Sequence, residues 1–203
     1  MHSSSFIILT ALFTVSISAL RSQNQVSELQ APIDGFDIVI SQWEVQATPE
    51  GEKLILAGTV EQVLGELRGI NPDYEKDFGL DSELPLPVIH KLNDFSNAPF
   101  ACNTTNAMAD QSIIVKGAKY LRGVKGKPYQ PPGPSTCARV SCSWKSAIWW
   151  CNHANTPREL GSFGEIADGA DRIVQGCQTN GEWIDGQTWH KDDWSVVVGR
   201  SDC

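Results

Sequence analysis

Two histidines and three aspartates in the C-terminal part of the chain are the residues best suited to acid–base chemistry. His153 and His190 end stretches of strand-like composition, and Asp185, Asp192 and Asp193 lie near them in sequence. A histidine beside a carboxylate can transfer protons during hydrolysis, including nuclease-type hydrolysis. The spacing is nonspecific, and no GxSxG, HExxH or glycine-rich phosphate loop is present. The two histidines are therefore weak catalytic candidates, and we expect a protein without enzymatic activity.

Tryptophan is the second residue type that could form a site, because its ring offers a large apolar surface. Six of the seven tryptophans lie after residue 100. Trp149 and Trp150 are adjacent in a predicted strand, so they must point to opposite faces of a sheet. We expect Trp144 and Trp149 to belong to the core. Trp150, Trp189 and Trp183 are the candidates for an exposed platform that binds a glycan, a lipid or a protein.

A run of basic residues without an intervening acid is the third candidate. It consists of Lys116, Lys119, Arg122, Lys125 and Lys127. Three readings stay open: a solvated helix face, contact with anionic lipid or phosphate through Lys119 and Arg122, and docking against the acidic first half of the chain. Binding to nucleic acid is not expected, since the formal net charge is −8 and no recognised motif is present.

The N-terminus and the cysteines together predict an exported protein. Residues 1–19 have the short apolar run and the small residues of a secretory signal peptide, and no later stretch is long and apolar enough to be a transmembrane segment. An even number of cysteines in such a chain predicts three disulfides, with fifteen possible pairings. The six are Cys102, Cys137, Cys142, Cys151, Cys177 and Cys203. No CxxC motif is present, and we expect neither a metal ion nor a cofactor.

Composition divides the chain near residue 100. Residues 23–100 contain 14 acidic and 4 basic residues and no cysteine, whereas residues 101–203 contain 10 acidic and 11 basic residues. Within the acidic half, residues 37–69 predict a β-hairpin followed by a helix, and 71–98 an extended linker. Residues 20–100 are either a pro-region that is removed or a permanent N-terminal domain, and the sequence leaves both open.

The cysteine-rich half, residues 101–203, predicts an α-β-β-α-β-β order. Helical spacing occurs around residues 106–124 and 162–177, and KGAKYLRG and DGADRIVQG within them share a Gly-Ala pair. Strand patterns lie at 137–144 and 147–153, where alternation places Ala138, Val140, Cys142 and Trp144 on one side, and again at 181–190 and 194–200. Residues 125–135 are expected to be a loop. The fold class is thus α+β: a two-layer α/β sandwich with an antiparallel sheet and three disulfides, preceded by a small ββα unit.

Several stretches resemble small secreted cysteine-rich proteins of filamentous fungi. They are LRGVKGKP, GPSTCARVSCSWKSAIWWCN, IADGADRIV, WSVVVGRSDC and the N-terminal WEVQATPEGEKLILAGTVEQVLGEL. More distantly, a helix that ends in cysteine and is followed by strands and a terminal cysteine is similar to smut-fungus killer toxins and necrosis-inducing effectors. The resemblance implies a disulfide-bonded α/β sandwich of effector-like or toxin-like type, and it assigns no functional residue.

These observations together predict a secreted, extracellular, monomeric effector or toxin-like protein. It would act by surface binding on a protein, glycan or lipid of a host or competitor cell. The alternatives are a nuclease-like hydrolase that uses His153 and His190, and a glycan-binding module that uses the tryptophans. Asn103 begins the sequon Asn-Thr-Thr and is the predicted glycosylation site.

Overall fold

The computed structural model describes residues 29–80, 95–105, 107–177 and 181–203, so the predicted signal peptide lies outside the described residues. These residues form a mixed α/β structure that is mostly sheet, as expected in outline. The helices are α1 (Val60–Ile70), α2 (Tyr74–Asp77), α3 (Gln111–Gly123) and α4 (Gly164–Gly176). The strands are β1 (Asp37–Val39), β2 (Gln42–Gln46), β3 (Lys53–Ala57), β4 (Phe100–Cys102), β5 (Ala109–Asp110), β6 (Gly126–Gln130), β7 (Thr136–Ser143), β8 (Ser146–Asn152), β9 (Arg158–Glu159), β10 (Trp183–Ile184), β11 (Gly186–His190) and β12 (Trp194–Arg200).

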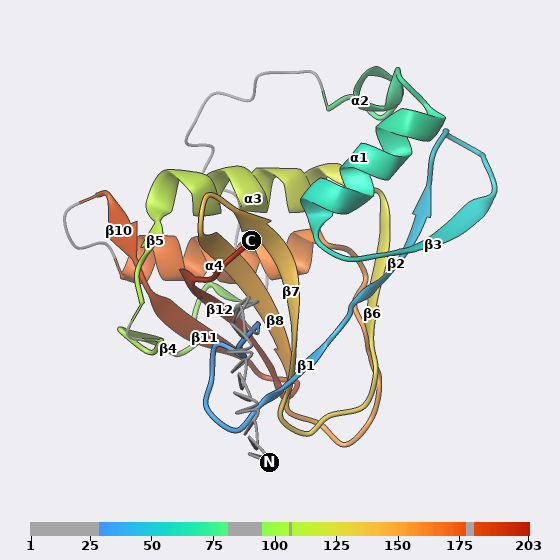
Figure 1. Cartoon of the computed structure of the whole chain (residues 1–203). Helices are drawn as coiled ribbons and strands as arrows, with labels where there is room; N and C mark the ends of the chain where they lie inside the picture. Colours follow the sequence, from blue (N-terminus) through green and yellow to red (C-terminus); the bar gives the residue numbers. More distant parts are fainter. Residues whose placement is uncertain (1–28, 81–94, 106, 178–180) are drawn as a thin grey trace, which may run out of the picture.

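A six-stranded sheet with the order β1-β7-β8-β12-β11-β4 is the centre of the fold. Helices α3 and α4 lie side by side across one face of this sheet (Figure 1). All neighbouring strands run antiparallel except β1, which runs parallel to β7. The strands that residues 101–203 contribute to this sheet are antiparallel, as expected, but the sequence did not predict the added parallel strand β1. The parallel strand comes from the acidic half, and a long stretch of chain separates it from β7, as a parallel pair requires.

The Gly-Ala pair that the two helices share has a packing role. A Cβ atom added at Gly117 of α3 would lie 2.5 Å from the Ser141 Oγ of β7, and one added at Gly169 of α4 would lie 2.5 Å from the Val196 Cγ2 of β12. Real side chains do not approach so closely, so each helix needs glycine where it meets the sheet. The alanine after each glycine is also buried. Close packing of helix on sheet thus accounts for this part of the sequence similarity.

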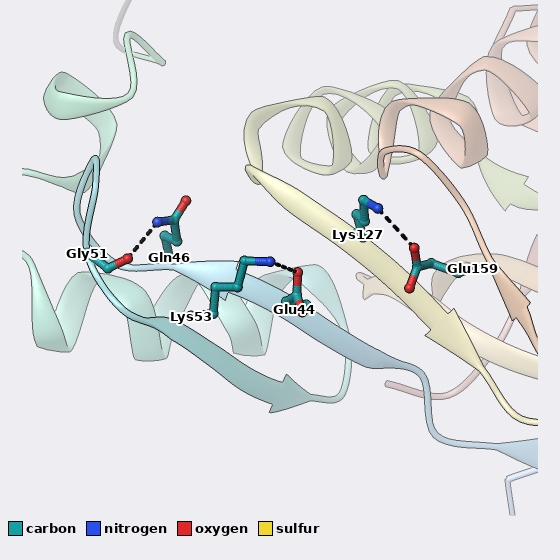
Figure 2. A network of polar contacts seen from close by, with 6 residues as sticks. All are labelled: Glu44, Gln46, Gly51, Lys53, Lys127 and Glu159. Carbon is teal, nitrogen blue, oxygen red and sulfur yellow. Dashed lines mark hydrogen bonds and ion pairs between the residues drawn. The ribbon is translucent and has the colours of Figure 1, made fainter.

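A second, four-stranded sheet has the order β3-β2-β6-β9. It combines the predicted hairpin β2–β3 with β6, which lies where the sequence predicted a loop. On its outer face, Lys53 pairs with Glu44 at 2.8 Å and Lys127 pairs with Glu159 at 3.0 Å (Figure 2). Glu44 lies directly opposite Lys127 in the strand register, so charges alternate across all four strands. Such exposed pairs contribute little to stability individually, but the alternation avoids like-charge contacts.

The acidic half contacts the cysteine-rich half at several points. The ring of Trp43 on β2 stacks on that of Phe163 before α4, with centroids 4.1 Å apart. Ile33, Phe36 and Ile38 pack against the face of the large sheet that α3 and α4 do not cover. The two halves on either side of residue 100 are therefore joined by strand pairing and by core contacts. Removal of residues 20–100 stays a prediction.

Three disulfides are present, as expected. They join Cys102 to Cys177, Cys137 to Cys151, and Cys142 to Cys203. The first ties β4 to the end of α4, the second links directly paired residues of β7 and β8, and the third ties β7 to the C-terminus. The cross-links therefore hold the central hairpin β7–β8 and both ends of the cysteine-rich half.

A β-bulge in β7 explains why the prediction that Ala138 and Cys142 lie on the same side of the strand was wrong. The register of β7 against β8 shifts between Arg139 and Ser141. Before the bulge, Ala138 belongs to the core under the helices, whereas Cys142 after it belongs to the cluster on the opposite face. A bulge inserts one residue and so reverses the alternation of side chains, which a simple period of two does not predict.

Candidate functional site

The turn between β7 and β8 presents the most exposed large hydrophobic side chain among the described residues. Trp144 is 83% exposed, although the sequence predicted a core position. The turn consists of Trp144 and Lys145, whereas the strands predicted at 137–144 and 147–153 left Lys145 and Ser146 as the turn. A shift of one residue moves Trp144 from the strand to the tip of the hairpin. We call Trp144 and Lys145 the hairpin tip.

The backbone of the hairpin tip is left-handed at both residues. The φ angle is +48° at Trp144 and +59° at Lys145. Two-residue hairpin turns of this kind favour asparagine and glycine, which tolerate positive φ. A bulky residue in this region is uncommon and costs on the order of 1–3 kcal/mol. The strain identifies the tip as a position where folding alone would favour another residue.

Several contacts hold the hairpin tip in place. The Ser201 N–H donates to the Lys145 carbonyl at 3.3 Å, and the Ser146 hydroxyl donates to the Trp144 carbonyl at 3.4 Å. The disulfide of Cys142 lies two residues before the tip. The tip is therefore supported from the C-terminal segment as well as from its own strands.

Two further exposed apolar residues lie on or next to short strands beside this end of the hairpin. Met108 precedes β5 and is 43% exposed, and Trp183 on β10 is 50% exposed. Trp183 pairs with Asp110 of β5, whose N–H donates to the Ser146 hydroxyl at 3.0 Å. The backbone thus places three exposed apolar side chains at one end of the large sheet.

His153 belongs to a polar cluster on the face of the sheet away from the helices. Its Nε2 atom lies 2.8 Å from the Ser195 Oγ, and the Gln187 side-chain amide donates to the same oxygen at 3.0 Å. Burial lowers the pKa of His153, and the negative charge of Asp193 opposes that shift. A neutral histidine beside a hydroxyl could serve as a base, but Ser195 is fully buried and Phe36 packs edge-on against the His153 ring. In this arrangement, a substrate has no access to the hydroxyl.

His190 lies on the opposite face of the same sheet. Its ring stacks on Trp194, with centroids 4.6 Å apart, and Phe95 packs against both rings. Its Nδ1 atom lies 3.4 Å from a carboxylate oxygen of Asp192. Because Trp194 and Ser195 are consecutive in β12, the side chains that contact them lie on different faces. The alternative in which His153 and His190 act together in one catalytic site is therefore not supported by their positions.

The structure also separates the predicted binding residues. Trp150 is fully buried under the helices, so the prediction that it offers an exposed platform was wrong. Trp149 points to the other face, but the N-terminal segment with Ile33 and Phe36 covers it. Trp189 is half-buried. The adjacent tryptophans do face opposite ways, but both are core residues because both faces are covered.

Of Lys119 and Arg122, the two basic residues of α3 predicted to contact anionic lipid or phosphate, only Lys119 is exposed. Arg122 forms ion pairs with Asp168 at 2.6 Å and Asp171 at 2.8 Å. Both aspartates lie on α4, so Arg122 joins the two helices, and its role is intramolecular. Asn103, the predicted glycosylation site, is exposed with φ of +57°.

A groove of about 920 Å³ lies between the N-terminal segment and the C-terminus. The Arg139 guanidinium lies 5.8 Å from the Trp149 ring there and donates to the Ser201 hydroxyl at 3.1 Å and to the Asp202 carbonyl. The charged residues that line the groove are Asp34, Arg139, Arg200 and Asp202. Because both signs are present in equal number, the groove has no evident selectivity for an anion or a cation.

Among the described residues, no group of three or more His, Cys, Asp or Glu side chains could hold a metal ion. Within the same ranges, none of the helices has the length and apolar character that a membrane span requires. No protein-family model, curated protein or solved structure matches the chain. The exposure of Trp144 and the left-handed backbone of the turn are therefore the evidence for the hairpin tip as the candidate functional site.

Proposed function

We propose that this chain is a secreted effector-like or toxin-like binding protein that contacts a component of a host or competitor cell through the hairpin tip. The observation that carries the proposal is the 83% exposure of Trp144 in a left-handed turn. Tryptophan is prominent among the residues that dominate binding energy at protein interfaces. An exposed indole at the end of a cross-linked hairpin is suited to such a contact.

The contacts beneath the hairpin tip favour a pre-ordered binding surface over a mobile loop. Cys137–Cys151 and Cys142–Cys203 cross-link the hairpin, and Ser201 bonds to the Lys145 carbonyl. A pre-ordered surface loses less conformational entropy when it binds a partner. Disulfides of this number also suit a protein that works outside the cell.

The positions of the histidines support a non-enzymatic role. His153 and His190 face opposite sides of the large sheet, and the hydroxyl beside His153 is buried. The hydrolase alternative would need one of these sites to open. A double variant, His153→Ala with His190→Ala, should leave any cellular response unchanged if the protein acts by binding.

The proposal is tested by applying the purified full chain without its signal peptide to host tissue and to competing microbes. We expect necrosis or growth inhibition with the wild-type protein. Trp144→Ala should reduce that response strongly while its thermal unfolding stays like that of the wild type. Tyr129→Ala, which removes an exposed aromatic ring from β6, is the control and should leave the response intact. The absence of any response to the folded wild-type protein, or an equal response to Trp144→Ala, would contradict the proposal.

A further inference from the structure

Strand β3 forms an open edge of the four-stranded sheet. It pairs with β2 on one side, and no strand among the described residues pairs with it on the other (Figure 2). The backbone N–H and C=O groups along an open edge can accept another strand by the same hydrogen bonding that joins strands within a sheet.

The composition of β3 makes this edge attractive to a second strand. Leu54, Ile55 and Leu56 are consecutive apolar residues, and the strand contains neither proline nor a bulge. Ile55 is 62% exposed on the outer face, and Leu54 and Leu56 are only partly buried against the core. Proteins usually protect edges with charge, proline or bulges, whereas Lys53 is the single charge in β3. Pairing with another strand would cover apolar side chains on both faces at once.

We propose that β3 pairs with β3 of a second copy of this chain, antiparallel across a two-fold axis, with Ile55 opposite Ile55. This register places Leu54 opposite Leu56 of the partner copy and Lys53 opposite Ala57. The two four-stranded sheets then join into one continuous sheet. A two-fold interface of this kind uses the same surface on both copies.

The charges of the strand fit this register. Like charges directly opposite each other destabilise a strand pair. In this register Lys53 lies opposite the small apolar side chain of Ala57, so no such pair forms. Each Lys53 also keeps its 2.8 Å ion pair with Glu44 in its own chain. The apolar centre and the absence of charge conflict favour a second copy over an unrelated strand. Since the interface is one five-residue edge, we expect a weak dimer with a Kd on the order of micromolar.

The test is sedimentation equilibrium of the purified full chain at concentrations from about 1 to 200 µM, a range that brackets a micromolar Kd. The wild-type protein should change from monomer to dimer over this range. Ile55→Lys places two like charges opposite each other and should stay monomeric. Ile40→Lys is the matched control, since Ile40 is 68% exposed but lies between β1 and β2. It should dimerise like the wild type.

A charge exchange tests the register itself. A mixture of Ile55→Lys and Ile55→Glu should form a heterodimer, because only in the symmetric register do these two positions face each other. A wild-type protein that stays monomeric at every concentration would overturn the inference, as would a dimer that Ile55→Lys does not weaken or a charge-exchange mixture that stays monomeric. Trp144→Ala should dimerise normally, so the failure of this inference and the failure of the proposed function give different results.

Discussion

The carboxylate of Glu61 on α1 accepts a hydrogen bond from the Ser141 hydroxyl on β7 at 2.6 Å. Its second oxygen accepts the backbone N–H of Cys142 at 3.1 Å. One side chain of the acidic half is thus bonded to the strand that carries the hairpin tip. The bulge of β7 lies immediately before these two residues, so the contact also supports the irregular part of the strand.

Loss of this contact should destabilise the whole fold. Glu61→Ala leaves the Ser141 hydroxyl and the Cys142 N–H without their acceptor, and we expect a loss of about 1–3 kcal/mol in the free energy of unfolding. Denaturant titration measures it. Glu66→Ala, a change on the exposed side of the same helix, should cost little. Equal stability of the two variants would show that the Glu61 contact is unimportant.

The cysteine-rich half should not keep its native structure alone. Residues 101–203 without the first half lack β1, the Trp43 ring against Phe163, and the cover over Trp149. We expect this fragment to lose the near-ultraviolet circular dichroism of the full chain, and addition of a separate fragment 20–100 to restore it. A fragment 101–203 with the spectrum and cooperative unfolding of the full chain would show that the first half is dispensable.

The sequence predicts the local elements of this fold better than its long-range pairing. The helix predicted within residues 37–69 forms as α1, and a capping box begins it, with the Thr59 N–H donating to the Gln62 side chain at 2.9 Å. Both amphipathic helices of the second half form near the expected bounds. Strand β6 was missed because Pro128 suggested a loop. Proline is compatible with this strand because β9 pairs only with Tyr129 and Gln130, the two residues after Pro128.

The candidate site was hidden from sequence reasoning for two physical reasons. The turn at Trp144 and Lys145 lacks the asparagine or glycine that usually identifies a left-handed hairpin turn. The burial of Trp149 depends on Ile33 and Phe36, more than a hundred residues earlier in the chain. Periodicity reports which residues share a face of a strand, but it does not report what covers that face.

His153 should make stability depend on pH. Burial lowers its pKa in the folded state, so the unfolded chain binds a proton more readily as the pH falls. Neutral His153 therefore makes its full contribution to the free energy of unfolding above about pH 6.5, the ordinary pKa of histidine. This contribution is lost as the pH falls below that value. Between about pH 7.5 and 5 we expect the wild-type protein to lose stability more steeply than His153→Gln. Denaturant titrations at each pH measure both slopes, and equal slopes would mean that His153 titrates alike in both states.

The most direct test of the hairpin tip is the affinity of the purified full chain for the intact cells on which it acts. Labelled wild-type protein, Trp144→Ala and the Tyr129→Ala control are titrated onto the same cells. We expect Trp144→Ala to weaken binding at least about tenfold, as loss of a dominant aromatic contact does. Tyr129→Ala should bind like the wild type. Equal affinities of wild type and Trp144→Ala, with both proteins folded, would contradict the assignment of Trp144 as the binding residue.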